Sequence, residues 1–120
     1  MQDVVIFYGS SSQIENLYQA MDVFVMPSFC EGLPVAGVET QVSGLPLILS
    51  DSITAEVKVI DTTKYISLKE SPEEWAKAIL EFKGKCNRRS HIDEVKKAGF
   101  DEKDTSALFE NYYTNILKNI

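Results

Sequence analysis

The first 57 residues of this chain contain no lysine and no arginine, although they carry seven acidic side chains. All twelve basic residues lie in the remaining 63 positions, where eleven acids offset them. Nucleic-acid-binding proteins gather basic and aromatic side chains on one surface, whereas the basic residues here are spread through helical patterns. We therefore expect no nucleic acid partner.

Long apolar runs and abundant cysteine are also missing. No run approaches the ~18 residues that a membrane-spanning helix needs, and the opening residues MQDVVIFYG lack the basic segment of a secretion signal. The two cysteines, Cys30 and Cys86, have no metal-ligand spacing and suit a reducing compartment. These absences predict a cytoplasmic protein.

A chain of 120 residues suffices for one domain with a core but not for two. Its first fifty residues alternate between apolar runs and helical patterns. The runs at 4–8, 23–26 and 46–50 predict buried strands with helices between them, and the second helix should run from about 34 to 43 with Gly44 as its terminator. Right-handed crossovers would lay these strands parallel.

The second half continues this pattern less clearly. Residues 64–68 predict a fourth strand, and a Ser-Pro pair predicts a helix over about 71–82. A short helix is expected near 92–98, and the last helix, about 105–118, has an apolar stripe too broad for a lone surface helix. The predicted fold class is therefore α/β: a three-layer, Rossmann-like open parallel sheet of about four strands with helices on both faces.

The stretch CEGLPVAGVET, residues 30–40, places one glutamate before a helix start and another inside an otherwise apolar helix. In open parallel sheets, ligands bind beyond the carboxyl ends of the strands. The helix N-terminus offers unpaired amides that favour phosphate, and Gly32 lets a ligand approach the backbone. Glu31 precedes this position and Glu39 lies about 7.5 Å along the helix. Such a pair would suit a nucleotide sugar, with hydroxyls on both sides of a diphosphate.

These motifs together resemble the C-terminal, donor-binding domain of GT-B-fold retaining glycosyltransferases of group 1 (family 4). The resemblance rests on the strand end DVFVMPS, on EGLP, on the eight-residue separation of Glu31 and Glu39, and on GLPLILSD. Each motif is short, but their order and spacing on a matching β-α-β frame are specific. The resemblance covers about residues 4–60.

The resemblance implies transfer of a hexose, often from a UDP-sugar, to a glycan or lipid-linked acceptor with retained configuration. Many relatives build capsule, exopolysaccharide or other surface glycans. Glu31 would be the catalytic residue, in contact with the hexose near its anomeric centre. The backbone at Gly32, Leu33 and Pro34 would face the diphosphate or sugar, and Glu39 would bind ribose hydroxyls. The family needs no metal, so no cofactor is expected.

Ser10 has two interpretations that the sequence leaves open. It resembles part of a loop that rims the donor site, but the serines at 10–12 also explain helix capping, with Ser11 or Ser12 as the cap. Ser28 and Cys30 raise the possibility of a nucleophile. The single histidine lies far away in a polar link, at position 91, so structural roles are favoured for both.

Family members also have an N-terminal acceptor domain with a histidine, and an arginine and a lysine for the diphosphate, before the strand expected at 4–8. This sequence lacks them and has no cation before Lys58. We therefore expect residues 1–120 to be a single, truncated donor-binding domain that does not catalyse transfer without the acceptor domain or a partner chain. Residues 104–120 would be the helix that crosses back to that domain, or a surface for self-association. The complete enzyme could lie peripheral to the inner face of the membrane.

Two other interpretations use the same sheet. A phospho-receiver domain has this size, but it needs acidic residues at the ends of early strands, and the first expected strand ends at Tyr8, Gly9 and Ser10. A non-catalytic nucleotide-sugar-binding or interaction module stays open, because a chain without an acceptor domain would only bind.

Overall fold

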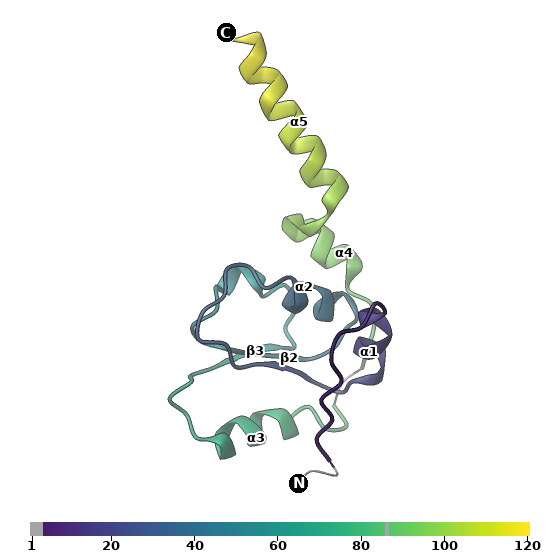
Figure 1. Cartoon of the computed structure of the whole chain (residues 1–120), viewed down its shortest axis with the longest axis vertical. Coiled ribbons are helices and arrows are strands. Elements are labelled where there is room, and N and C mark those ends of the chain that lie inside the picture. Colours follow the sequence, from purple (N-terminus) through teal and green to yellow (C-terminus); the bar gives the residue numbers. More distant parts are fainter. Residues whose placement is uncertain (1–3, 86) are drawn as a thin grey trace.

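The computed structural model describes residues 4–85 and 87–120 (Figure 1). Cys86 lies outside the described residues, and Cys30 is an exposed, free thiol. Each helix and strand expected from residue 23 onward is present within a few residues of its expected bounds. The elements in chain order are α1 (Ile14–Ala20), β1 (Phe24–Met26), α2 (Val35–Val42), β2 (Leu47–Ser50), the 3₁₀ turn η1 (Ala55–Val57), β3 (Thr63–Ile66), α3 (Pro72–Leu80), α4 (Ile92–Val95), the π-type turn η2 (Lys96–Phe100) and α5 (Glu102–Lys118).

Three strands form one parallel sheet in the order β1-β2-β3. Ile48 of β2 lies opposite Val25 of β1 and Lys64 of β3. All four residues of the central strand β2 are buried, which confirms the strand expected at 46–50. Because α2 connects β1 with β2, the two strands run in the same direction. The parallel α/β fold is confirmed.

The strand expected at residues 4–8 does not form. These residues lie outside the sheet, and their exposed fractions range from 52% for Val5 to 96% for Phe7. The prediction rested on β-branched and aromatic composition. Such composition indicates that a segment fits a pleated surface, but it does not supply the neighbouring strand that its backbone must bond. Among residues 4–85 and 87–120 the sheet therefore has three strands where about four were expected.

β1 is an edge strand, and it is half-buried where a fully buried strand was expected. The Phe24 N–H donates to the Pro46 carbonyl oxygen at 2.9 Å. In a parallel ladder, only every second residue of a strand bonds a given neighbouring strand. Because Phe24 bonds to β2, the N–H and C=O groups of Val25 point away from β2. Within the described residues no strand pairs with that outer edge. The missing neighbour explains the partial exposure of β1.

Helices cover both faces of the sheet, with α2 on one side and α3 on the other in Figure 1. α3 buries Ala78, and its N-cap is Ser71, whose hydroxyl accepts from the Glu74 N–H at 3.4 Å. The larger core lies on the α2 face, and α4 contributes to it. Its buried members are Val38, Leu47, Leu49, Ile53, Val57 and Val95, with Phe24, Met26 and Tyr65 among the side chains packed around them. The three-layer arrangement is confirmed.

Gly44 directly follows the C-cap of α2, where the sequence predicts the residue that terminates this helix. Gly44 has a φ of +68°, a left-handed conformation that glycine adopts without a Cβ clash. Its N–H donates to the Gln41 carbonyl at 3.0 Å, and the Leu45 N–H donates to the Thr40 carbonyl at 3.1 Å. A Cβ on Gly44 would lie 2.0 Å from the Arg89 carbonyl oxygen. The end of α2 therefore packs directly against the segment that precedes α4.

α1 begins without the serine cap expected at Ser11 or Ser12. Gln13 takes the N-cap position, but its side chain caps no backbone N–H of the helix, and the Ser11 hydroxyl accepts from the Gln13 N–H at 3.0 Å. The rings of Tyr18 and Phe24 meet edge to face with centroids 5.9 Å apart. A helix of seven residues depends on such tertiary packing more than on its cap.

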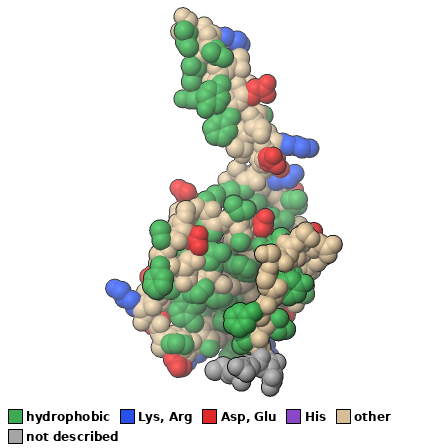
Figure 2. All heavy atoms as spheres, in the orientation of Figure 1, with side chains coloured by type: hydrophobic (Ala, Val, Ile, Leu, Met, Phe, Trp, Pro, Cys, Tyr) green, Lys and Arg blue, Asp and Glu red, His purple; other side chains and the backbone are tan. Residues whose placement is uncertain are grey.

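α5 leads away from the sheet and gives the molecule a long axis of 63 Å (Figure 1). It begins three residues earlier than expected, because the Asp101 carboxylate accepts from the N–H groups of Lys103 and Asp104. None of its residues is buried. Figure 2 shows apolar side chains along it, and those exposed are Leu108, Phe109, Tyr112, Tyr113, Ile116 and Leu117. In the ranges that the structure describes, no helix has the length and apolar character to span a membrane.

Candidate functional site

The loop of residues 27–34 joins the carboxyl end of β1 to the start of α2. The hydroxyl of Ser50, the last residue of β2, donates to the Ser28 carbonyl oxygen at 2.5 Å. Ser50 is fully buried, so this hydrogen bond ties the beginning of the loop to the end of the central strand. The loop therefore lies beyond the carboxyl ends of the strands, where ligands of parallel α/β proteins bind.

Glu31, Gly32 and Leu33 lie at the exposed part of this loop. Gly32 does not have a positive φ, and a Cβ placed on it would meet no atom within 4 Å. Neither backbone conformation nor packing within the described chain requires glycine at this position. The open space above its backbone is accessible to a ligand.

The buried Pro34 forms the N-cap of α2, where the sequence predicted it at the first helical position. Its carbonyl oxygen accepts from the N–H of Gly37 at 3.0 Å and of Val38 at 3.4 Å. No side chain caps the helix. The first N–H groups of an α-helix have no acceptor within it and carry a partial positive charge. The start of α2 thus offers hydrogen-bond donors at the loop.

Glu39 is exposed on α2, and one of its carboxylate oxygens has a partner from another helix. The Tyr18 hydroxyl of α1 donates to Glu39 Oε2 at 3.0 Å. Burial of Tyr18, together with this hydrogen bond and the negative charge of Glu39, raises the pKa of the Tyr18 phenol to about 12. Tyr18 therefore stays protonated at neutral pH and can only donate to Glu39.

Gln41 fixes α2 against the segment that leads into β3. Its side chain is fully buried, and Nε2 donates to the carbonyl oxygens of Gly37 at 2.9 Å and Val57 at 2.7 Å. Oε1 accepts from the N–H groups of Val59 and Ile60 and from the Thr63 hydroxyl. With the buried side of α2 anchored in this way, Glu39 remains on its exposed side.

Arg88 binds at the C-terminal end of α2, opposite the end at which the loop enters the helix. Its Nε donates to the carbonyl oxygen of Ser43, the C-cap of that helix, at 3.1 Å. Its other donors bind carbonyl oxygens of the last turn of α1 and of its C-cap, Met21. Within residues 4–85 and 87–120, neither Glu31 nor Glu39 takes part in an ion pair. The described chain therefore brings no paired cation to the loop.

Of the residues predicted for the site, Glu31, Gly32, Leu33 and Pro34 form one continuous loop, and α2 presents Glu39 after it. Ser10 is exposed in the irregular segment before α1, and no hydrogen bond of its side chain joins it to this loop in the part of the chain described. Sequence reasoning assigned no role to the hydroxyl of Tyr18, which lies in the helical stretch expected between residues 8 and 23. A tyrosine at a core position was the available signal, since a buried hydroxyl needs a partner.

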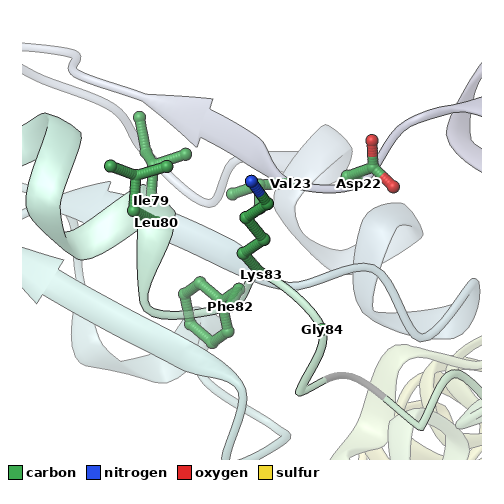
Figure 3. Close-up of a pocket in the computed structure, with 7 residues that line it drawn as sticks. All are labelled: Asp22, Val23, Ile79, Leu80, Phe82, Lys83 and Gly84. Carbon is green, nitrogen blue, oxygen red and sulfur yellow. The ribbon is translucent and has the colours of Figure 1, made fainter.

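A hollow of about 670 Å³ lies elsewhere, between β1 and the end of α3 (Figure 3). Val23, Ile79, Leu80 and Phe82 give it an apolar lining, and Asp22, Lys83 and Gly84 complete it. None of the predicted site residues lines it. This hollow is therefore not the candidate site, of which Glu31, Gly32, Leu33 and Glu39 are exposed.

Residues 1–98 match the family described as glycosyl transferases group 1. The chain is 38% identical over 112 residues to the "Putative glycosyltransferase EpsF" of Bacillus subtilis, a match that covers 91% of this chain and 29% of that protein. It is 45% identical over 47 residues to the Escherichia coli UDP-Gal:alpha-D-GlcNAc-diphosphoundecaprenol alpha-1,3-galactosyltransferase, which covers 39% of this chain and 12% of that enzyme.

A third relative is the Campylobacter jejuni N,N'-diacetylbacillosaminyl-diphospho-undecaprenol alpha-1,3-N-acetylgalactosaminyltransferase, 40% identical over 47 residues. That match covers 39% of this chain and 12% of the relative. No solved structure gives a significant match. The chain thus spans less than a third of the length of these relatives. The family match covers most of the chain and agrees with its parallel α/β sheet, so the chain belongs to the group 1 glycosyltransferase family.

Proposed function

We propose that this chain is the donor-binding domain of a retaining glycosyltransferase that transfers a hexose from a nucleotide diphosphate sugar. One observation carries the proposal: two exposed carboxylates, Glu31 and Glu39, lie before and after the uncapped start of α2. Carboxylates accept hydrogen bonds from sugar hydroxyls, and helix-start amides donate to phosphate oxygens. The order of these groups along the loop and helix matches the order of hexose, diphosphate and ribose in such a donor.

Each proposed contact assigns one part of the donor to one residue. Glu31 binds the hexose near its anomeric carbon, and the backbone at Gly32, Leu33 and Pro34 faces the diphosphate or sugar. Glu39 accepts hydrogen bonds from the ribose hydroxyls, and Ser10 is kept as a residue of the rim. No metal is part of this proposal, because helix-start amides and cations supplied by the rest of the enzyme would carry the diphosphate charge.

In the proposed reaction, the bond between the anomeric carbon and a diphosphate oxygen breaks while the acceptor hydroxyl oxygen bonds to that carbon with retention. The acceptor proton passes to the departing diphosphate or to water. Positive charge develops on the sugar ring, and the Glu31 carboxylate would stabilise it. Negative charge develops on the diphosphate, and the α2 amides would stabilise that charge.

The relatives guide the choice of donor and acceptor. One relative's name specifies a UDP-sugar donor, and two relatives' names specify acceptors on diphosphoundecaprenol. We infer a UDP-sugar and a lipid-linked or glycan acceptor for this enzyme, in the synthesis of capsule, exopolysaccharide or another surface glycan. A lipid-linked acceptor would place the working enzyme in the cytoplasm at the inner face of the membrane.

The isolated chain is proposed to bind the donor without turning it over. Both glutamates of the site are exposed, and neither pairs with a cation in the described ranges. Transfer would therefore need an acceptor domain or a partner chain that closes the site, with the exposed stripe of α5 crossing to it or self-associating. An exposed site without a paired cation is also what the alternative, a non-catalytic binding module, would have. Measured sugar transfer by the 120-residue chain alone would contradict both.

Calorimetry with UDP, UDP-glucose and a GDP-sugar tests the donor site. Gly32→Ala is a sharp variant, because its Cβ would meet nothing in the fold yet would enter the space above the loop. We expect unchanged thermal stability and weakened binding of one nucleotide diphosphate sugar. Glu39→Ala should weaken binding as well, whereas Glu110→Ala on α5 removes an exposed acid far from the loop and should not. Absence of binding to every nucleotide would overturn the proposal.

A further inference from the structure

Tyr18 is held at both ends by residues distant in the sequence. The residue is only 3% exposed, and its ring packs edge to face on Phe24 of β1. Its carbonyl oxygen accepts from the Arg88 guanidinium, and its hydroxyl donates to Glu39 Oε2 at 3.0 Å. A side chain fixed in this way has little freedom to move its hydroxyl. The donor to Glu39 is therefore pre-positioned by the fold.

Glu39 has no comparable restraint of its own. It is exposed on α2, and in the described chain its carboxylate makes no ion pair. A free glutamate side chain samples several rotamers, and fixing it on ligand binding costs conformational entropy. The Tyr18 hydroxyl removes part of that cost before a ligand arrives. Oε1 keeps both of its lone pairs for the ligand, because the hydrogen bond uses Oε2.

We propose that Tyr18 is a positioning residue, which orients the Glu39 carboxylate toward the vicinal hydroxyls of the donor's ribose. This inference rests on the proposed function of Glu39 and adds a specific residue, from a different helix, that determines how well Glu39 works. Tyr18 itself touches no substrate. Its neutral phenol suits the role, since a hydroxyl that donates to one carboxylate oxygen leaves the negative charge in place for the ligand's hydroxyl donors.

The test uses calorimetry to compare the affinities of Tyr18→Phe and of the wild type for UDP, UDP-glucose and a GDP-sugar. The phenylalanine ring keeps the packing on Phe24, so only the hydroxyl is lost. We expect the affinity for the nucleotide diphosphate sugar to fall about 3- to 10-fold, the effect of leaving one flexible side chain to be ordered on binding. Tyr65→Phe is the matched control, because its hydroxyl also donates from a partly buried position, to the Thr54 carbonyl at 2.9 Å. That variant should bind as the wild type does.

A double-mutant cycle separates positioning from general destabilisation. If Tyr18 acts through Glu39, the loss caused by Tyr18→Phe should disappear in the Glu39→Ala background. An equal loss in both backgrounds would overturn the positioning role, and so would wild-type affinity in Tyr18→Phe. In either case, weakened nucleotide binding in the Glu39→Ala single variant would still support the donor site. If the wild type binds no nucleotide, the donor site fails, and the positioning role fails with it even where NMR shows the Tyr18 to Glu39 bond intact.

Discussion

The Arg88 guanidinium donates to the carbonyl oxygen of Ser43 across 45 positions of the chain, at 3.1 Å. The same group donates to the Met21 carbonyl at 2.8 Å and to the Gln19 carbonyl at 3.1 Å. Carbonyls at a helix C-terminus have no partner within the helix and carry a partial negative charge. Arg88 therefore joins the ends of α1 and α2, the two helices that carry Tyr18 and Glu39.

Arg88→Ala should lower the free energy of unfolding by about 2–4 kcal/mol, because it leaves several partly buried carbonyls without a charged donor. Arg88→Lys should recover only part of this, since an ammonium cannot reproduce the planar arrangement of guanidinium donors. Urea denaturation measures both values. Equal stability of the alanine variant and the wild type would show that water replaces these bonds.

Gly44→Ala should be among the most damaging single changes in the chain. The left-handed backbone costs a non-glycine residue about 1–2 kcal/mol, and the new Cβ would lie 2.0 Å from the Arg89 carbonyl oxygen. Gly84→Ala is a matched control, because Gly84 has a φ of +71° but no atom within 4 Å of its Cβ position. Thermal unfolding measures the stability of both variants. We expect Gly84→Ala to lose only the free energy of the left-handed backbone, and Gly44→Ala to lose clearly more.

Gln41→Ala should cost about 3 kcal/mol or more, because it removes one buried amide and leaves its main-chain partners unpaired. Those partners include the Val57 carbonyl and the N–H groups of Val59 and Ile60. Gln19→Ala, at an exposed position, should change stability by no more than about 0.5 kcal/mol. Hydrogen exchange should show increased opening of residues 57–63 in Gln41→Ala, and unchanged protection there would contradict the anchoring role.

The Tyr18 phenol should titrate near pH 12, which NMR of labelled tyrosine can measure. A tyrosine pKa raised by folding stabilises the protein below the unfolded value near 10, and that contribution is lost as the pH rises toward 12. Stability should therefore fall across this range. In Glu39→Ala the pKa should decrease, although burial would still hold it above the ordinary value. An unchanged pKa in that variant would show that the hydroxyl does not bond Glu39 in solution.

Patterns that depend on neighbouring residues in the chain predicted most of the fold. Gly44 terminates α2, Ser71 caps α3, and the run at 46–50 forms the buried central strand, because helix ends and apolar runs are local properties. The run at 4–8 has the same kind of composition but forms no strand. A strand needs a partner for its backbone, and pairing depends on which segments meet in space.

The site shows the same division between local and distant information. The spacing of Glu31 and Glu39, with Gly32 and Pro34 between them, indicated a loop that leads into a helix, and the structure has that loop and helix at the end of β1. The sequence could not indicate that Tyr18 would reach Glu39. These residues are 21 positions apart and meet only because the fold places the Tyr18 ring on Phe24 of β1, with its hydroxyl 3.0 Å from Glu39 Oε2.

The sequence by itself determined the family, the alternation of strands and helices, and the residues around which a donor site can be proposed. Those conclusions rest on short-range spacing, which the chain carries in its order of residues. Only the tertiary structure decided that β1 lies at an edge, that Gln41 and Arg88 hold α2 in place, and that Tyr18 donates to Glu39. Each of these depends on contacts between distant segments, and such contacts exist only once the helices have packed on the sheet.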